Sequence, residues 1–259
     1  MEYIVYTDLD GTLIDEGYSL KDSRRVLEQI LGKNIPVIFC TSKTRLETLH
    51  YQKLAGVKDP FIVENGSAII IPKDCMLYNE ADVEADGGYK VIELVEKGLV
   101  RQKVGKIRSD YGLSFTGFHD MTLEELMEDS GLSREEAVMA REREYTVAAK
   151  DLDGEDKTIL LQNGLKLIQG GRYVGIGLSS KGDAVKKLTE AYRRRHPLAK
   201  TIGVGDSPND YSMLKKCDKG VLVKKPGGGY AKNPPSHIIL SEEVGPKGFS
   251  LSLKELILD

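Results

Sequence analysis

The 259-residue sequence contains no tryptophan, only three cysteines and no apolar run near the length of a membrane span. Cys40, Cys75 and Cys217 are odd in number and widely separated, so they match neither a disulfide framework nor the spacing of metal ligands. A net charge of −3 gives no reason to expect general affinity for nucleic acid or for anionic membranes. Together with the lack of a visible signal peptide, these absences predict a cytoplasmic protein that does not bind membranes.

The two ends of the sequence alternate strand and helix patterns. Near the N-terminus, buried strands are predicted at 3–6 and 35–40, amphipathic helices at 20–34 and 43–56, and a strand, turn and strand over 61–72. The C-terminal part continues with a helix, a strand, a helix and two short strands, at 179–196, 199–206, 210–217, 220–223 and 237–240. This alternation predicts an α/β fold with a Rossmann-like parallel sheet and crossover helices.

The middle of the sequence has a different pattern. A strand at 87–94 precedes a helical pattern that runs to about residue 110. Two capping boxes then open short helices, Thr122 with Glu125 and Ser133 with Glu136.

Further along the middle part, strands are predicted at 143–149 and 158–162, and a hairpin at 165–178. This mixture indicates an inserted α+β unit, or cap. We expect the cap at residues 86–177, between the two halves of a catalytic core at 1–85 and 178–259.

Two aspartates, Asp8 and Asp10, directly follow the first predicted strand. Ligands of open parallel sheets bind beyond the carboxyl ends of the strands, so both carboxylates should face the binding crevice. Two carboxylates placed there repel each other unless a cation or a shared proton offsets the repulsion. The alternative is an ordinary polar turn after a strand, because short motifs often match by chance.

Three further motifs stand at predicted strand or helix ends. Thr41 and Ser42 follow the second strand, where they could donate hydrogen bonds to a phosphate, and Lys181 begins a helix, where its ammonium could neutralise an oxyanion. Asp206 and Asp210 follow a third strand and could complete an oxygen-only site for a hard cation such as Mg²⁺. Each motif alone has an ordinary explanation, but their combination indicates a phosphoryl-transfer site.

The sequence resembles the haloacid dehalogenase superfamily in four motifs, which are "DLDGT" at 8–12, "TS" at 41–42, Lys181 and "GDSPND" at 205–210. The position of the insert is similar to that of the larger cap of the Cof-like phosphatases in this superfamily. A resemblance to the mannosyl-3-phosphoglycerate phosphatases rests on five segments, "SKTRLE" at 42–47, "PFIVENGSAI" at 60–69, "GGYKVIEL" at 87–94, "GLSREEAVMAREREY" at 131–145 and "GGRY" at 170–173. Val147 and Ser180 depart from that family, which commonly has acidic residues at these two positions. Neither position belongs to the catalytic set of the superfamily.

The resemblance implies a role for each residue of the four motifs. Asp8 would be the nucleophile that forms an aspartyl-phosphate, and Asp10 would protonate the leaving oxygen and later activate water. Thr41, Ser42 and Lys181 would hold the other phosphoryl oxygens.

The same resemblance implies Mg²⁺ as cofactor. Its ligands would be Asp8, the backbone carbonyl of Asp10, and Asp206, while Asp210 or Asn209 ligates or orients.

The implied substrate is a phosphorylated glycosyl-glycerate, whose carboxylate and hydroxyls the cap would recognise. Guanidinium groups suit carboxylates, which makes Arg143 and Arg172 candidates; surface salt bridges are an equal alternative for both. The other candidates are Lys43 and Arg45 near the entrance to the core, Gly170 and Gly171 through their backbone amides, and Asn65. Asn65 and its neighbour Glu64 would either orient substrate or shape a turn.

Three other functions stay open. The chain could be another phosphatase with the same insert, acting on phosphoglycolate or a sugar phosphate. It could also be a phosphomannomutase, which shares the aspartate motif and the cap position but retains a bisphosphate intermediate. A non-catalytic binding module would have no need of the nucleophile Asp8. We expect neither nucleic acid nor a membrane as a partner, and we expect the chain to be a monomer or a homodimer.

Overall fold

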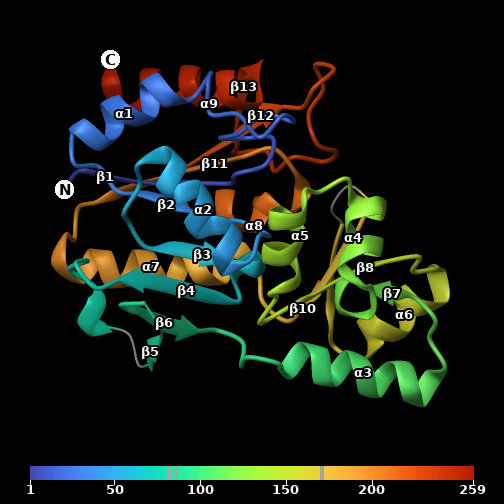
Figure 1. The fold of residues 1–259 in the computed structure, drawn as a ribbon. Helices are drawn as coiled ribbons and strands as arrows, with labels where there is room; N and C mark the ends of the chain where they lie inside the picture. Colours follow the sequence, from blue (N-terminus) through green and yellow to red (C-terminus); the bar gives the residue numbers. More distant parts are fainter. Residues whose placement is uncertain (81–82, 86, 170–171) are drawn as a thin grey trace.

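The computed structural model describes residues 1–80, 83–85, 87–169 and 172–259, and its central element is a five-stranded parallel sheet (Figure 1). The strands lie in the order β13-β12-β11-β1-β2. Their bounds are β1 Tyr3–Thr7, β2 Val37–Phe39, β11 Lys200–Gly205, β12 Lys219–Lys224 and β13 Ile239–Val244. The predicted Rossmann-like α/β core is therefore confirmed.

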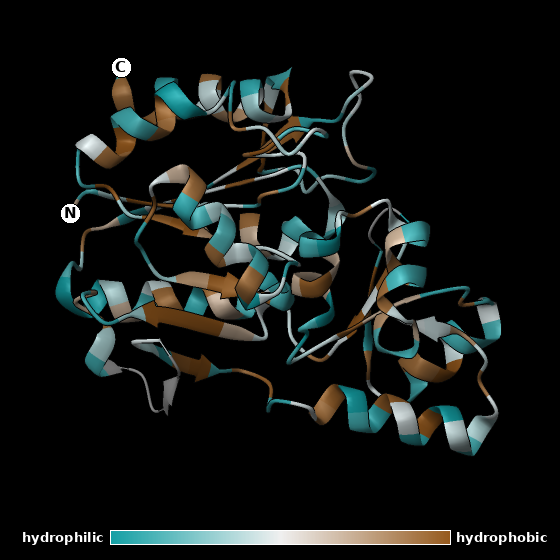
Figure 2. Cartoon of the chain, viewed as in Figure 1, coloured by the Kyte–Doolittle hydropathy of each residue, from teal (hydrophilic) through white to brown (hydrophobic). Residues whose placement is uncertain are grey.

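Helices cover both faces of this parallel sheet, whose strands β1, β2, β11 and β12 are mainly apolar and buried (Figure 2). One face packs against α1 (Arg24–Gly32), α2 (Arg45–Ala55) and α9 (Gly245–Leu253), after which a short π-helix runs over Lys254–Leu258. The opposite face packs against α7 (Lys181–Arg195) and α8 (Tyr211–Leu214). Burial on both faces explains why these strands appear in the sequence as short continuous apolar runs.

A second, antiparallel sheet continues from the edge of the first, because Cys40, just after β2, forms a parallel bridge with Ile62. Its order is β3-β4-β6-β5. The elements of this part are β3 Phe61–Val63, the 3₁₀ turn Glu64–Gly66, β4 Ala68–Pro72, the 3₁₀ turn Tyr78–Glu80, β5 Val83–Ala85 and β6 Tyr89–Glu93.

Strand β6 falls within the range expected for the insert, yet it pairs with β4 in register, with Ile92 opposite Ile69. We therefore propose that the inserted unit begins after Glu93 and not at residue 86.

The remainder of the insert forms a four-stranded antiparallel sheet in the order β7-β8-β10-β9. Helices α3 and α6 pack on one face of this sheet, and α4 and α5 pack on the other. The bounds are α3 Leu99–Tyr111, β7 Thr116–Gly117, a 3₁₀ turn Phe118–Asp120, α4 Leu123–Ser130, α5 Arg134–Arg141, β8 Val147–Lys150, α6 Gly154–Gln162, β9 Lys166–Gln169 and β10 Val174–Gly177. Both predicted capping boxes are present, at the starts of α4 and α5.

The strand expected at 158–162 is wrong, because these residues belong to helix α6. Asp153 caps this helix by accepting a hydrogen bond from the backbone N–H of Asp156 at 2.8 Å. The Asp156 carboxylate in turn accepts from the backbone N–H of Asp153. This reciprocal cap outweighs the β preference of Thr158 and Ile159.

None of the helices in the described part of the chain combines the length and the apolar character that crossing a membrane requires.

Candidate active site

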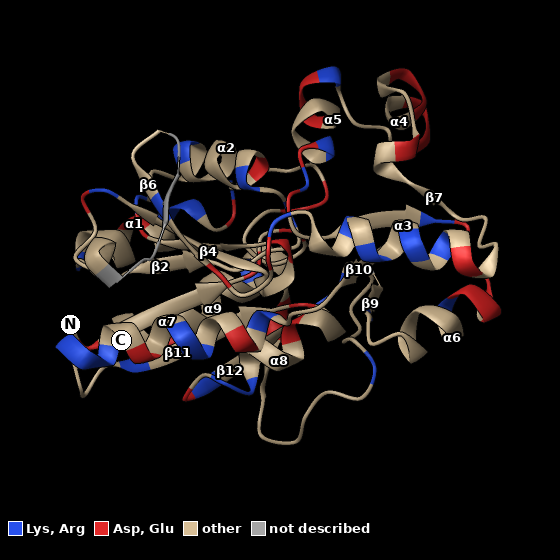
Figure 3. Ribbon diagram, turned by 90° about the horizontal axis from the view of Figure 1, so that it is seen from below, with Lys and Arg blue, Asp and Glu red and all other residues tan. Residues whose placement is uncertain are grey.

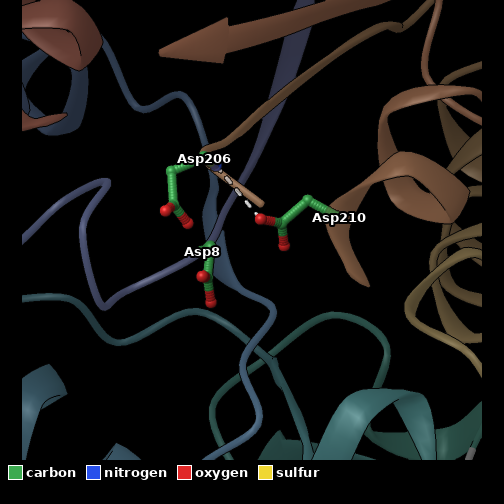
Figure 4. Close-up of side chains that lie close together, drawn as sticks. All are labelled: Asp8, Asp206 and Asp210. Atoms are coloured by element: carbon green, nitrogen blue, oxygen red, sulfur yellow. Dashed lines mark hydrogen bonds between the residues drawn. The ribbon is translucent and has the colours of Figure 1, made fainter. Parts of the chain in front are cut away.

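Three aspartates converge beyond the carboxyl ends of neighbouring parallel strands (Figure 4). Asp8 follows β1, Asp206 follows β11, and Asp210 ends a short 3₁₀ turn over Pro208–Asp210. One carboxylate oxygen from each residue lies within 4.8 Å of the others. The parallel pairing of β1 with β11 brings these distant parts of the sequence together.

Lys181 joins two of these aspartates from the first position of α7. Its Nζ donates to Asp8 Oδ1 at 2.8 Å and to Asp210 Oδ1 at 2.7 Å, and only 1% of the residue is exposed. Burial opposes the charged ammonium, but the carboxylates of Asp210 and Asp8 outweigh it, so the pKa of Lys181 is raised. The lysine is therefore a fixed cation inside the site.

The carboxyl group of Asp8 has a pKa raised well above its ordinary value. Burial is the main cause, and the neighbouring charges of Asp210, Asp206 and Asp10 add to it, while Lys181 opposes it. Burial, followed by Asp210, also raises the pKa of Asp206 to about 6. The cluster thus holds more negative charge than its surroundings neutralise, which favours a bound cation.

Asp210 organises the loop that carries Asp206. Its Oδ2 accepts hydrogen bonds from the backbone N–H groups of Asp206 and Ser207, both at 3.0 Å, and from the Ser207 hydroxyl at 3.2 Å. Because Lys181 occupies its other oxygen, the carboxylate of Asp210 is already well satisfied. Asn209 accepts a hydrogen bond from Ser207 and lies near Asn65, with its Nδ2 3.5 Å from Asn65 Oδ1.

The residues fit a hard divalent cation. All the converging donors are carboxylate oxygens, the ligands that Mg²⁺ prefers. Gly11 adopts a positive φ of +70°, and a Cβ there would lie 3.1 Å from Asp206 Oδ2. The loop after β1 thus requires a glycine in order to approach the carboxylate of Asp206.

Asp10 lies outside the buried cluster, and 44% of its side chain is exposed. Its carboxylate forms an ion pair with Lys43 at 3.0 Å. Burial lowers the pKa of Lys43, but the neighbouring carboxylates of Asp10 and Glu47 raise it by a larger amount, so the net shift is upward. Lys43 therefore stays charged and fixes the position of the Asp10 carboxylate.

Thr41 and Ser42 follow β2, as predicted. Thr41 is fully buried, and its hydroxyl accepts a hydrogen bond from the backbone N–H of Lys43 at 3.1 Å. The hydroxyl of Thr12 is buried and has no hydrogen-bond partner among the residues that the structure describes. A buried polar atom without a partner is costly, which suits a site that a ligand completes.

Arg143 lies where the insert meets the core. One of its guanidinium nitrogens donates to the backbone carbonyl of Ser42 at 3.1 Å and to the hydroxyl of Thr146 at 3.0 Å. The nearby hydroxyl of Thr44 donates to the backbone carbonyl of Met139, at the other side of this junction, at 3.0 Å. Arg143 thus contacts the loop after β2 directly.

Glu64 joins core and insert through several hydrogen bonds, and its sequence neighbours give no signal of this contact. This carboxylate is fully buried and accepts hydrogen bonds from three successive backbone N–H groups, those of residues 144–146, and from the Thr146 hydroxyl. This contact differs from both roles predicted for Glu64, which were to orient substrate or to shape a turn. Asn65, beside it, is also buried and has a positive φ of 59°.

The remaining candidates from the sequence are dispersed. Arg172 is 66% exposed and binds the carbonyl and carboxylate of Asp129, which is the salt-bridge alternative. The guanidinium of Arg45 lies 5.4 Å from the centre of the Tyr89 ring. Residues 170 and 171, predicted to bind substrate through backbone amides, lie outside the described residues.

Comparison with known proteins agrees with this geometry. The family model of haloacid dehalogenase-like hydrolases matches residues 5–98 and 175–231, which include the four motif regions. The chain belongs to this family.

Curated relatives extend the similarity of this haloacid dehalogenase-like hydrolase over nearly the whole chain. A glucosyl-3-phosphoglycerate/mannosyl-3-phosphoglycerate phosphatase of Methanococcoides burtonii is 41% identical, over 99% of this chain and 98% of the relative. A mannosyl-3-phosphoglycerate phosphatase of Pyrococcus horikoshii is 36% identical, over 93% of this chain and 98% of the relative. The resemblance noted from the sequence is therefore confirmed.

The fold of this haloacid dehalogenase-like hydrolase also matches solved structures. A subclass IIB sugar phosphatase of the superfamily superposes with a TM-score of 0.66, covering 98% of both chains at 16% identity. Such a match shows a shared core and cap arrangement.

Proposed function

We propose that this hydrolase is a Mg²⁺-dependent phosphatase that converts glucosyl- or mannosyl-3-phosphoglycerate into the glycosylglycerate and phosphate. The chemistry is supported by the buried arrangement of Asp8, Lys181 and Asp210 beside Asp206. The choice of substrate rests chiefly on the relative from Methanococcoides burtonii, which is 41% identical along nearly its full length.

In this proposal Asp8 attacks phosphorus and forms an aspartyl-phosphate, releasing the glycosylglycerate oxygen. Lys181 suits this step because its ammonium, 2.8 Å from Asp8 Oδ1, keeps one carboxylate oxygen oriented and offsets charge on the phosphoryl group. Thr41 and Ser42 would donate hydrogen bonds to the other phosphoryl oxygens.

Asp10 is assigned the proton transfers. It would protonate the leaving oxygen and then take a proton from the water that hydrolyses the aspartyl-phosphate. Its half-exposed carboxylate can reach a substrate held between core and cap, and the ion pair with Lys43 at 3.0 Å orients it.

The metal would be held by Asp8, Asp206 and the backbone carbonyl of Asp10. When bound, Mg²⁺ offsets the repulsion between carboxylates and phosphate and stabilises charge on the transferring group. Because Asp210 already accepts hydrogen bonds from Lys181, Ser207 and the amide of Asp206, we assign it the orienting role.

The substrate would lie between core and cap. Arg143 is the cap arginine best supported for this region, since it contacts the carbonyl of Ser42. Arg143 would affect substrate binding in two ways, by positioning the loop after β2 that carries Ser42 and by the charge of its own guanidinium.

A phosphate-release screen tests the proposal. Purified protein with Mg²⁺ is offered glucosyl- and mannosyl-3-phosphoglycerate, phosphoglycolate, and hexose monophosphates, each alone. We expect kcat/KM for a glycosyl phosphoglycerate to exceed that for the other esters by at least about tenfold, or roughly 1.4 kcal/mol in transition-state binding. Equal or better use of phosphoglycolate or hexose phosphate would reject the substrate assignment. Transfer of phosphate between sugar positions without net release would indicate a mutase.

A further inference from the structure

The insert contains a basic hollow that the proposed reaction uses only through Arg143. It has a volume of about 580 Å³ and is lined only by residues of the insert, from α3, the 3₁₀ turn before α4, the start of α4, and the end of α5. Three guanidinium groups line it, those of Arg101, Arg141 and Arg143. We call it the cap hollow.

The positive charge of the cap hollow is only partly neutralised. Within the described part of the chain, Arg101 and Arg141 form no ion pair, whereas Arg143 forms one with the buried carboxylate of Glu64 at 4.0 Å. Glu142 supplies the only carboxylate among the lining residues. Figure 3 shows basic residues both along α3 and on α5. Basic side chains gathered along a hollow raise the local concentration of anions.

The position of Arg101 is not explained by the stability of its own helix. Arg101 lies in the first turn of α3, which has no acidic residue and no side-chain cap. A cation there opposes the helix dipole, whose positive end is at the N-terminus. Arg141, in the last turn of α5, is favoured by its helix, whereas the exposed Arg101 gains no stability from its own helix.

His119 reports the electrostatic potential of the cap hollow. The pKa of this lining imidazole is lowered, first by burial and then by the charges of Arg101, Arg108 and Arg141, against the opposing effect of Asp120. An anion bound among the arginines would reverse part of this effect, which makes His119 a natural probe.

We propose that the cap hollow binds a small organic molecule that carries two or more phosphate or carboxylate groups. Guanidinium groups match both anions with paired hydrogen bonds, and here they come from two segments, α3 and the end of α5, which can engage separate groups of one ligand. Leu123 and Val138 provide an apolar wall for the carbon skeleton, and the volume is in the range of small-molecule sites.

The ligand would influence the reaction through Arg143. Its guanidinium lines the cap hollow and also donates to the carbonyl of Ser42 at 3.1 Å. A bound anion would compete for this guanidinium and so alter the hold of the insert on the loop after β2. The cap hollow is thus a regulatory site, distinct from the site of phosphate transfer proposed above.

Binding can be measured without activity by following the four histidine side chains in heteronuclear NMR spectra. Inorganic phosphate, 3-phosphoglycerate and citrate are titrated separately into the Mg²⁺-free protein, and a His119→Gln variant assigns the His119 signal. We expect 3-phosphoglycerate or citrate to shift this signal in a saturable way and to raise the pKa of His119. His50, His196 and His237 serve as internal references.

The double variant Arg101→Gln/Arg141→Gln should bind the same anion at least about tenfold more weakly, a loss of roughly 1.4 kcal/mol. Its kcat/KM without added anion should stay within about twofold of the parent, whereas Arg25→Gln, at an exposed position of α1, should change neither binding nor activity. Comparing 3-phosphoglycerate with citrate distinguishes phosphate from carboxylate recognition. Uniform small shifts of all four histidines, or equal affinity in the double variant, would overturn the proposal even if phosphatase activity is confirmed.

Discussion

The carboxylate of Glu64 holds the insert against the core, and replacing it by glutamine isolates that effect. Glu64 Oε1 accepts from the backbone N–H of Glu144 at 2.8 Å, and Oε2 accepts from the N–H of Tyr145 at 3.1 Å, the N–H of Thr146 at 2.8 Å and the Thr146 hydroxyl at 2.6 Å. The residue is fully buried and has a positive φ of 47°. Such a backbone conformation is unfavourable for glutamate, so these contacts must offset it.

Glutamine keeps the size of the side chain but turns one acceptor oxygen into an NH₂ donor. Even in its better orientation, with the amide oxygen at the Oε2 position, the N–H of Glu144 loses its acceptor. The bonds that remain also lose their charge assistance. Removing one charge-assisted bond costs about 1.5–3 kcal/mol, and leaving a buried N–H unpaired is costly in itself. We therefore expect Glu64→Gln to lower the free energy of unfolding by about 3 kcal/mol.

Urea unfolding measures this loss, and steady-state kinetics shows its effect on the reaction. Glu93→Gln is the matched control, because the Glu93 carboxylate accepts one hydrogen bond, from the Tyr145 hydroxyl at 3.1 Å, in the same region. That variant should lose no more than about 1 kcal/mol. We also expect Glu64→Gln to lower kcat/KM, since the insert would dock less firmly. If both variants lost the same small amount, the carboxylate of Glu64 would not hold the insert.

Three other perturbations test separate parts of the structure. Burial raises the pKa of Asp59 from 3.8 to about 6, so ionising Asp59 destabilises the folded state as the pH rises through this range. Asp59→Asn should therefore raise the free energy of unfolding by up to about 3 kcal/mol at about pH 8 and change it little at about pH 4, as measured by urea unfolding. A Cβ on Gly182 would lie 2.4 Å from the backbone oxygen of Ser212, so Gly182→Ala should lower the free energy of unfolding by about 1–3 kcal/mol. Gly105→Ala in α3, where nothing lies within 4 Å of the new Cβ, should be neutral or stabilising. A loss of stability in both variants would refute the overpacking argument. Mg²⁺ at a hundred times its dissociation constant should raise the free energy of unfolding by about 2.7 kcal/mol and so raise the melting temperature, and chelation should reverse this gain. Asp206→Asn should reduce the gain, and an unchanged gain would place the metal elsewhere.

The sequence was sufficient to predict that Asp8 and Asp206 lie close together, because parallel strands impose their own geometry. Once Asp8 and Asp206 were assigned to the ends of two buried strands, the sheet had to bring them to one edge. The capping boxes of α4 and α5 were predictable for a similar reason, since the signal and the contact both lie within four residues.

Contacts between distant segments were not predictable in this way. The role of Glu64 depends on the backbone of residues 144–146, which carries no side-chain signal in the sequence. The strand predicted at 158–162 is helical because the helix-starting cap of Asp153 and Asp156 lies outside that short apolar segment. Arg172 could have bound a substrate carboxylate, but only the fold shows that Asp129 lies beside it.

The central claim, that Asp8 carries the phosphoryl group, can be tested by trapping the covalent intermediate. The enzyme is mixed with Mg²⁺ and glycosyl phosphoglycerate labelled with radioactive phosphate, quenched in acid within one turnover, and digested for mass spectrometry. We predict that the label appears on the peptide containing Asp8, is released by hydroxylamine as acyl phosphates are, and is absent from Asp8→Asn. Product formed in the first turnover without protein-bound phosphate, or with phosphate on another residue, would contradict the account.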